Sequence, residues 1–375
     1  MGCGVPIVIE DNTRRGNNET FEKKRFIGKG NLGEVYLVKS TKTKEEYALK
    51  EINVINANPE IIKKEADSLN ELDHPNIITF KNAFITTNSK NILNIMSEFV
   101  ENGDLGKELS EHHKKNIYFV ENQILDWLSQ ICMALAYLHE KKIVHGDIKP
   151  SNIFLTKNNS IKLGDFGNFK KALILDYNNL YLPPEFFEKN ECSNAGDIWS
   201  LGATFCHLIT LEFPFEGNNK DEIYENIKKG TKNKKILNEE KNNYNKTILD
   251  IYNKELLDLI DEMMSLDPIQ RPMAQDILRK NVIKNRMNKY LEENNYDAKK
   301  NNEACLSIRK YNENLEKKRL KHKESLIALD VENSVKNNEM YYYNLDNVQE
   351  KENKRNYDLL RQMSMMFDQA TKNNK

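Results

Sequence analysis

The segment IVHGDIKPSNIF, residues 143–154, places an acid, a cation and an amide at fixed intervals. Transfer of a phosphoryl group needs a carboxylate to orient and deprotonate the attacking hydroxyl, a cation to offset charge, and oxygen ligands for magnesium. Asp147, Lys149 and Asn152 supply these groups, and Asp165, eighteen residues after Asp147, adds a charged magnesium ligand. The spacing predicts a phosphotransfer site with Asp147 and Lys149 as catalytic residues and with Asn152 and Asp165 as metal ligands.

A glycine-rich segment near the start of the chain could bring backbone close to phosphate oxygens. Gly28, Gly30 and Gly33 follow the G-x-G-x-x-G spacing, which removes side chains from such an approach. A dinucleotide-binding fold would continue into a helix, whereas residues 34–38 alternate like a strand. We therefore expect a loop between two strands that covers a nucleotide. For this segment taken alone, a plain glycine turn stays open.

Two charged residues are expected to complete a nucleotide site. Lys50 ends the strand pattern YALK, where a buried ammonium needs an anion. Glu65 lies among the apolar residues of a helix expected over residues 59–72. A pair between Lys50 and Glu65 would hold the ammonium toward the α- and β-phosphates of a nucleotide. The alternative is a solvated Glu65 on a charged helix.

The order of sequence patterns predicts an α+β chain, with a small β-rich half before a larger helical half. A long helix is expected over residues 120–140, where apolar residues recur at intervals of three and four. Residues 217–246 are crowded with Asn and Lys and are expected to form a surface insertion. After residue 285 the chain is highly charged and lacks Gly and Pro, which favours helix or disorder. Alternation of apolar residues predicts strands over residues 34–40, 46–52 and 92–99.

The composition of the chain excludes several classes of protein. Among 375 residues, 56 Lys and Arg balance 57 Asp and Glu, so no overall field recruits nucleic acid. Five scattered cysteines without a C-x-x-C pair argue against a zinc site or a disulfide framework and favour a reducing compartment. The sequence has no apolar run of membrane-spanning length and no secretory signal at its start. We expect a cytoplasmic protein.

The two ends of the chain leave alternatives open. Gly2 and Cys3 have the arrangement used for myristoylation with palmitoylation, but Pro6 stands where Ser or Thr is favoured. Membrane association through an acyl anchor and an ordinary flexible start are both compatible with this pattern. Residues 357–367 form an amphipathic segment that could dock on the main domain or on a partner, or stay a marginal solvated helix.

Together these motifs resemble those of the eukaryotic protein kinase family. The lysine two places after Asp147 is similar to the serine/threonine class, and the segments HPNII and FVENGDL are similar to the NIMA-related branch. The residues that match, in the family's order, are Gly28, Gly30, Gly33, Lys50, Glu65, His145, Asp147, Lys149, Asn152, Asp165, Phe166, Gly167, Pro184, Glu185, Asp197 and Arg271.

The resemblance implies a bilobal kinase domain over residues 21–284, with a small β-rich N-lobe and a larger helical C-lobe. A flexible segment over residues 1–20 would precede it, and a charged extension over residues 285–375 would follow. The cofactors implied are ATP and Mg²⁺, and the partners are protein substrates. The resemblance also implies that Glu185 pairs with Arg271 and that Asp197 supports the catalytic loop.

The resemblance further assigns the residues around the adenine. Val35 and Ala48 would cover the base, and Leu155 would lie beneath it. The backbone of Glu98, Phe99 and Val100 would bond its edge. Ser97 takes the gatekeeper position, where its small side chain would leave a pocket open behind the adenine.

Three positions depart from the family pattern. Gly146 stands where many of these kinases carry an arginine that clamps a phosphate on the activation loop. The loop itself, residues 165–185, contains no Ser or Thr, although Tyr177 and Tyr181 are conceivable phosphorylation sites. Asn178 replaces a threonine, and its amide can still donate and accept hydrogen bonds.

From these features we expect an active Mg-ATP-dependent serine/threonine kinase that does not rely on Ser or Thr phosphorylation of this loop. The alternative is a pseudokinase or a nucleotide-binding scaffold, which would bind without turnover.

Overall fold

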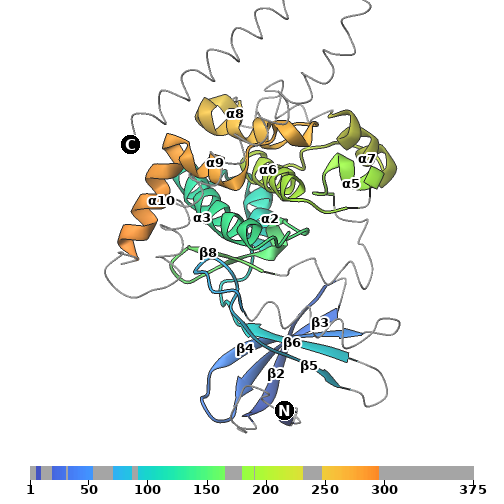
Figure 1. Ribbon diagram of the computed structural model, residues 1–375, viewed down its shortest axis with the longest axis vertical. Helices are drawn as coiled ribbons and strands as arrows, with labels where there is room; N and C mark the ends of the chain where they lie inside the picture. Colours follow the sequence, from blue (N-terminus) through green and yellow to red (C-terminus); the bar gives the residue numbers. More distant parts are fainter. Residues whose placement is uncertain are drawn as a thin grey trace, which may run out of the picture. The chain divides into compact units, whose positions relative to one another are not determined.

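The computed structural model describes residues 6–9, 19–30, 33–53, 71–86, 92–164, 180–189, 191–230 and 247–294. The chain divides into two compact units, residues 1–309 and 310–375, and every described residue belongs to the first. Within that unit a β-sheet comes first in the chain and a helical region follows (Figure 1). The α+β class predicted from the sequence is confirmed.

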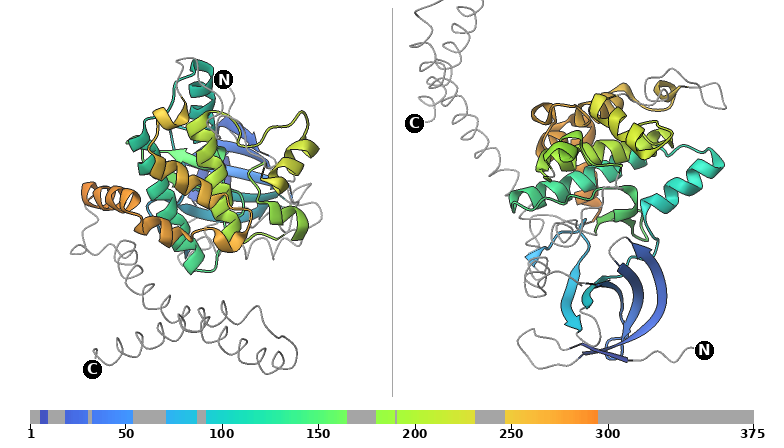
Figure 2. Two further views of the ribbon diagram at one scale, coloured as in Figure 1. Left: turned by 90° about the horizontal axis from the view of Figure 1, so that it is seen from above. Right: turned by 90° about the vertical axis from the view of Figure 1, so that its right-hand side faces the viewer.

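The N-terminal region is an antiparallel sheet with strand order β1-β2-β3-β4-β6-β5. Phe21, Val38, Tyr47, Leu49 and Met96 form the apolar core on one face of this sheet. Register shifts in β2 accompany the strong curvature of the blue strands in the right-hand view of Figure 2. Its strands are β1 (Pro6–Ile9), β2 (Glu19–Gly30), β3 (Gly33–Ser40), β4 (Glu46–Asn53), β5 (Phe80–Thr86) and β6 (Ile92–Glu98).

The strands predicted at residues 34–40, 46–52 and 92–99 are confirmed as β3, β4 and β6. Strand β1 differs from the expected flexible segment at residues 1–20, because Pro6–Ile9 pairs with the start of β2. The sequence of β1, PIVI, is apolar and β-branched, which suits an added strand. The helix expected over residues 59–72 lies almost wholly outside the described residues.

The helical region is built around α3 and α6, whose side chains are buried along nearly their whole length. Helices α9 and α10 pack against α3, and α8 packs against α6. A helix that is apolar on all sides belongs at the centre of a domain. The elements of this region are α2 (Leu105–Lys115), α3 (Glu121–Glu140), η2 (Pro150–Asn152), β7 (Ile153–Leu155), β8 (Ile161–Leu163), α5 (Pro184–Lys189), α6 (Asn194–Thr210), α7 (Lys220–Lys229), η3 (Ile248–Asp250), α8 (Lys254–Met263), η4 (Pro268–Gln270), α9 (Ala274–Arg279) and α10 (Asn281–Glu293).

Two features of this region correct or qualify the sequence predictions. Within the expected surface insertion, residues 220–229 form helix α7. Its Ile227 is fully buried, and the ring of Tyr224 packs at a tilt against Phe187, with ring centroids 4.6 Å apart. The other residues of α7 whose exposure the structure describes are exposed or half-buried, so this part of the expected surface insertion is a helix anchored by Ile227. Helix α10 runs through residue 284, where the kinase domain was expected to end. Among the helices of the described ranges, none is long and apolar enough to cross a membrane.

Candidate active site

Asp147, Lys149 and Asn152 come together in the loop that follows α3 and ends in η2. The Asp147 carboxylate oxygen Oδ2 accepts a hydrogen bond of 2.8 Å from Asn152 Nδ2 and lies 3.0 Å from Lys149 Nζ. Asn152 Nδ2 also donates to the Asp147 carbonyl at 2.7 Å. Asp147 and Asn152 are 2% and 3% exposed, so packing fixes their positions. The structure therefore brings together the acid, cation and amide that the sequence predicted.

His145 connects this loop to the end of β8. Its Nδ1 accepts from the Asp147 N–H at 3.2 Å, so the proton of the neutral ring lies on Nε2, which donates to the Gly164 carbonyl at 3.0 Å. Gly164 N–H in turn donates to the Asn152 carbonyl at 3.0 Å. These bonds hold Gly164, which directly precedes Asp165, against the catalytic loop of residues 145–152. Asp165 itself lies outside the described residues.

Asp197 supports the same loop from α6, as predicted. Its two carboxylate oxygens accept hydrogen bonds from the backbone N–H groups of His145 at 2.9 Å and of Gly146 at 2.8 Å. His139 Nε2 lies 2.8 Å from one of these oxygens. Asp197 sits in the first turn of α6, where the helix dipole favours a negative charge. The carboxylate thus satisfies backbone donors that would otherwise be buried without partners.

The structure gives a local reason for glycine at position 146. Its φ of +73° lies in the left-handed region, which disfavours any residue with a Cβ. A Cβ built at this position would lie 3.3 Å from the Cys192 sulfur. Both the backbone and the neighbouring thiol therefore disfavour the arginine that the kinase pattern would place here.

Glu185 and Arg271 pair as the resemblance implied. Two guanidinium nitrogens reach the two carboxylate oxygens at 2.6 and 2.8 Å, and the Arg271 side chain is fully buried. Its remaining donors bond the carbonyls of Ser265 and Ala195, and its guanidinium carbon lies 5.0 Å from the Trp199 ring centroid. This pair joins α5 to η4 beside the start of α6.

The glycine-rich segment forms a hairpin between β2 and β3, as expected from the alternation after Gly33. Gly28 pairs with Val35, and Gly30 pairs with Gly33. At Gly33 a Cβ would overlap the Glu51 carbonyl oxygen on β4, so only glycine permits this close approach. The residues between Gly30 and Gly33 lie outside the described ranges.

The strand register places the predicted nucleotide residues on one face of the sheet. Lys50 pairs with Val35, and Ala48 pairs with Ser97, and directly paired residues project to the same face. These four residues are only half-buried, whereas Leu49 points into the core on the opposite side. The half-buried face is therefore the one that a nucleotide could cover. Glu65, the expected partner of Lys50, lies outside the described residues.

The segment of residues 98–100, the hinge, was expected to bond the adenine edge through its backbone, and the structure reduces the number of backbone groups that can do so. Glu98 N–H donates to the Thr79 carbonyl at 2.9 Å, so this group is not available to the base. The Glu98 side chain is bound as well, because its Oε1 accepts from Thr79 N–H at 2.6 Å and from Lys162 Nζ at 2.8 Å. Of the three backbone N–H groups expected to bond the adenine edge, those of Phe99 and Val100 remain candidates.

The alternation of strand β7 places Phe154, rather than Leu155, on the face that a nucleotide could contact. Leu155 is 4% exposed and shares the buried face of β7 with Ile153, which is fully buried. Phe154, between them, is half-buried, and its ring lies 3.1 Å from a Cβ built at Gly164. Phe154 therefore suits the floor of a nucleotide site better than Leu155. The alternation of β7 carried this signal.

Tyr181 and His207 form a second feature that the sequence reading missed. The Tyr181 hydroxyl lies 2.8 Å from His207 Nδ1, and burial raises the pKa of Tyr181. Burial also lowers the pKa of His207 to about 4, while Glu212 raises it and His113 lowers it by smaller amounts. Because its hydroxyl is hydrogen-bonded to His207 and the residue is half-buried, Tyr181 is a poor phosphorylation site in this conformation. Tyr177 and Asn178 lie outside the described residues.

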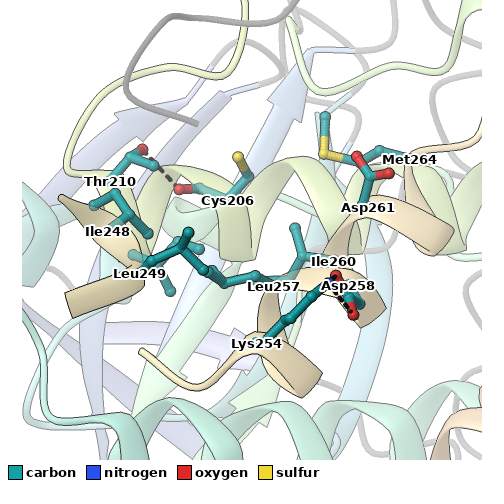
Figure 3. Close-up of a pocket in the computed structure, with 11 residues that line it drawn as sticks. Cys206, Thr210, Ile248, Leu249, Lys254, Leu257, Asp258, Ile260, Asp261 and Met264 are labelled. Carbon is teal, nitrogen blue, oxygen red and sulfur yellow. Dashed lines mark hydrogen bonds and ion pairs between the residues drawn. The ribbon is translucent and has the colours of Figure 1, made fainter. Parts of the chain in front are cut away.

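A cavity of about 260 Å³ in the helical region is separate from these residues. Figure 3 shows its lining from α6, η3 and α8, with Lys254 and Asp258 paired at 2.8 Å along one side. None of the predicted catalytic or nucleotide residues lines it. Within the described ranges, no group of three or more His, Cys, Asp or Glu side chains could hold a metal ion.

Comparison with known proteins agrees with this geometry. The protein kinase domain family matches residues 21–283, so the chain belongs to the protein kinase family. The serine/threonine-protein kinases Nek4 and Nek1 of Mus musculus are each 34% identical to it, over 74% and 73% of this chain. A probable serine/threonine-protein kinase nek3 of Dictyostelium discoideum is 34% identical over 77% of the chain. The recognition of a kinase similar to the NIMA-related branch is confirmed.

The chain covers only part of these longer relatives. It spans 34% of Nek4, 22% of Nek1 and 26% of the Dictyostelium protein. The similarity is therefore a similarity of kinase domains.

Proposed function

We propose that this chain is a Mg-ATP-dependent protein kinase that transfers the γ-phosphoryl group to serine or threonine of protein substrates. The observation that supports it most is the contact of Asp147 with both Lys149 Nζ at 3.0 Å and Asn152 Nδ2 at 2.8 Å. In this arrangement Asp147 accepts the proton of the attacking hydroxyl, and Lys149 offsets charge on the phosphoryl group.

The residues on the sheet and hinge suit a purine nucleotide. The half-buried face with Val35, Ala48 and Lys50 would cover the base and hold the α- and β-phosphates. A backbone N–H group of residues 99–100 would bond the adenine edge, and Phe154 would lie beneath the ring. The Gly28–Gly33 hairpin would cover the phosphates with backbone alone.

The donor set near Asp147 suits magnesium, which prefers oxygen ligands and keeps several waters. The amide oxygen of Asn152 and the carboxylate of Asp165 are the proposed ligands. When bound, the ion would offset charge on the phosphate oxygens. The protein's part is to hold Asn152, which is 3% exposed and bonded through its amide nitrogen to Asp147.

The activation loop is proposed to work without Ser or Thr phosphorylation. Residues 165–185 contain neither residue, and Gly146 provides no guanidinium to bind a loop phosphate. Mass spectrometry of active enzyme is expected to find no phosphate that activity requires in this loop. An obligatory phosphate on Tyr177 would show that the loop is switched through tyrosine, and it would overturn the explanation of Gly146 by the absence of a phosphorylation site.

Localisation in the cytoplasm, with membrane association through acylated Gly2 and Cys3, is proposed from the sequence alone. Metabolic labelling with myristate and palmitate analogues, compared between the wild type and Gly2→Ala, tests it. Absence of label from the wild type as well as from Gly2→Ala would contradict the acyl anchor.

A transfer assay tests the proposed function. Purified protein is incubated with ATP, magnesium and a generic basic protein, and phosphorylated residues are identified by mass spectrometry. We expect phosphoserine or phosphothreonine with the wild type and far less of either with Asp147→Asn in the same reaction time. Nucleotide binding without transfer by the wild type would instead identify a scaffold.

A further inference from the structure

The loop over residues 73–78 joins the N-terminal sheet to the end of β8. The Asn76 carbonyl accepts from Leu163 N–H at 2.8 Å, and Ile78 N–H donates to the Leu163 carbonyl at 2.9 Å. The chain continues from Leu163 to Gly164, which is bonded to both Asn152 and His145. A displacement of this loop would therefore move a residue that touches the catalytic loop.

The Asn76 side chain ties this junction to three parts of the helical region. Its Nδ2 lies 3.0 Å from the Ile161 carbonyl, 3.3 Å from Gln130 Oε1 and 3.1 Å from the Tyr290 hydroxyl. The side chain is fully buried, so these contacts replace water. Since the amide nitrogen carries two hydrogens for three acceptors, at least one hydrogen is shared.

Tyr290 belongs to α10, beyond the residues that match the kinase family. The helix is held on α3 by Ile283, Met287 and Leu291, spaced four apart and each at most 7% exposed. Arg286 adds polar contacts to Asp126, at 3.5 Å, and to Asn122. This packing fixes the side of α10 from which the Tyr290 ring reaches Asn76.

We propose that Tyr290 is a positioning residue of the kinase, and that α10 therefore helps to hold the catalytic loop in place. The Tyr290 hydroxyl accepts a hydrogen bond from the Asn76 side chain and so links α10 to this junction. The junction holds Leu163, and Leu163 places Gly164 against Asn152 and His145. The link to catalysis rests on the proposed function, whereas the link to the junction does not.

Hydrogen–deuterium exchange in the full chain tests the junction directly. The amides of Ile78 and Leu163 are the probes, because each donates across the junction. Tyr290→Phe is expected to raise their exchange about threefold, the factor of one shared neutral hydrogen bond. Tyr290→Ala, which also opens the buried amide to water, is expected to raise it more. Tyr252→Phe is the matched control, because it removes a tyrosine hydroxyl bond of 2.9 Å to the Phe119 carbonyl elsewhere.

Kinetics test the link to catalysis. We expect Tyr290→Ala to raise KM for Mg-ATP and to lower kcat, and Tyr252→Phe to change neither. Wild-type exchange at Ile78 and Leu163 in both Tyr290 variants would overturn the proposal. Raised exchange with unchanged KM and kcat would overturn its link to catalysis. If even the wild type transfers no phosphate, the proposed function fails, while the exchange result still decides whether Tyr290 holds the junction.

Discussion

At the scale of single residues, the glycine at position 146 has a structural cause as well as the functional one that the sequence suggests. The sequence identified a missing phosphate clamp, and the loop without Ser or Thr made that reading consistent. The structure adds a left-handed backbone and a thiol 3.3 Å from the site of a Cβ. No sequence pattern could reveal this, because Cys192 approaches Gly146 only through the fold.

Adding a Cβ at Gly146 is expected to destabilise the protein. Gly146→Ala should lower the free energy of unfolding by about 2 kcal/mol, from the left-handed φ and from crowding against Cys192. Gly103→Ala is the matched control, because Gly103 has a φ of +78° but a Cβ built there would meet only Cδ of the Lys107 side chain, at 3.7 Å. It should cost about 1 kcal/mol. Urea denaturation measures the free energy of unfolding of both variants. Equal decreases in the two variants would show that crowding against Cys192 does not contribute.

Ser97 is expected to control which inhibitors bind. It is half-buried, and it pairs with Ala48 on the sheet face proposed to cover the nucleotide. Ser97→Met should weaken ATP-competitive inhibitors with a bulky group at this point by roughly tenfold to hundredfold, because the methionine overfills the pocket. The KM for ATP should change little. Equal inhibitor affinities of the two forms, measured by calorimetry, would rule out this role.

At the scale of elements, strong periodicity was predictive and composition was not. Helix α3 and strands β3, β4 and β6 repeat apolar residues over seven or more positions, and all were predicted. Helix α7 was missed because Asn and Lys dominate its neighbourhood. Its signals were nevertheless present in the sequence: Asn219 as the N-cap, Tyr224 and Ile227 three apart, and Gly230 after the last turn.

The pair of Glu185 with Arg271 is expected to be a strong link between α5 and η4. Glu185→Ala should cost about 3 kcal/mol of stability, because it leaves the buried guanidinium without its carboxylate. In a double-mutant cycle with Arg271→Met, measured by denaturant unfolding, the coupling free energy should reach about 2 kcal/mol. A coupling free energy near zero would show that the two side chains contribute independently.

The burial of His207 should make the stability of the protein depend on pH. The pKa of His207 is lowered to about 4 by burial, so between this value and the usual value near 6.5 the unfolded state binds more protons. Its contribution is therefore present above about pH 6.5 and is lost on acidification, by about 2 kcal/mol between pH 7.5 and 5. His74, whose pKa burial lowers to about 3, contributes with the same sign.

His207→Gln separates these two histidines, because it removes one titration and leaves the other. The free energy of unfolding of this variant should fall less steeply with acid than that of the wild type. Parallel curves between pH 7.5 and 5 would contradict the role of His207.

At the scale of the whole molecule, the candidate site draws on segments that are far apart in the chain. Asp197 lies 51 residues after Gly146, and Arg271 lies 86 residues after Glu185, yet each pair is in contact. The sequence predicted these contacts because the kinase motifs fix both the residue types and their order. It did not predict the contact of Tyr290 with Asn76, because nothing in the spacing of α10 marks a partner 214 residues away.

The most direct test of the central claim is the single-turnover rate of phosphoryl transfer with saturating Mg-ATP, compared between the wild type and Asp147→Asn. Asp147→Asn preserves the size of a side chain that is 2% exposed, so the fold and nucleotide affinity should persist. If Asp147 takes the proton of the attacking hydroxyl, the rate constant should fall by about 10² to 10⁴. Equal rate constants for the two proteins would show that the cluster of Asp147, Lys149 and Asn152 does not perform the chemistry assigned to it.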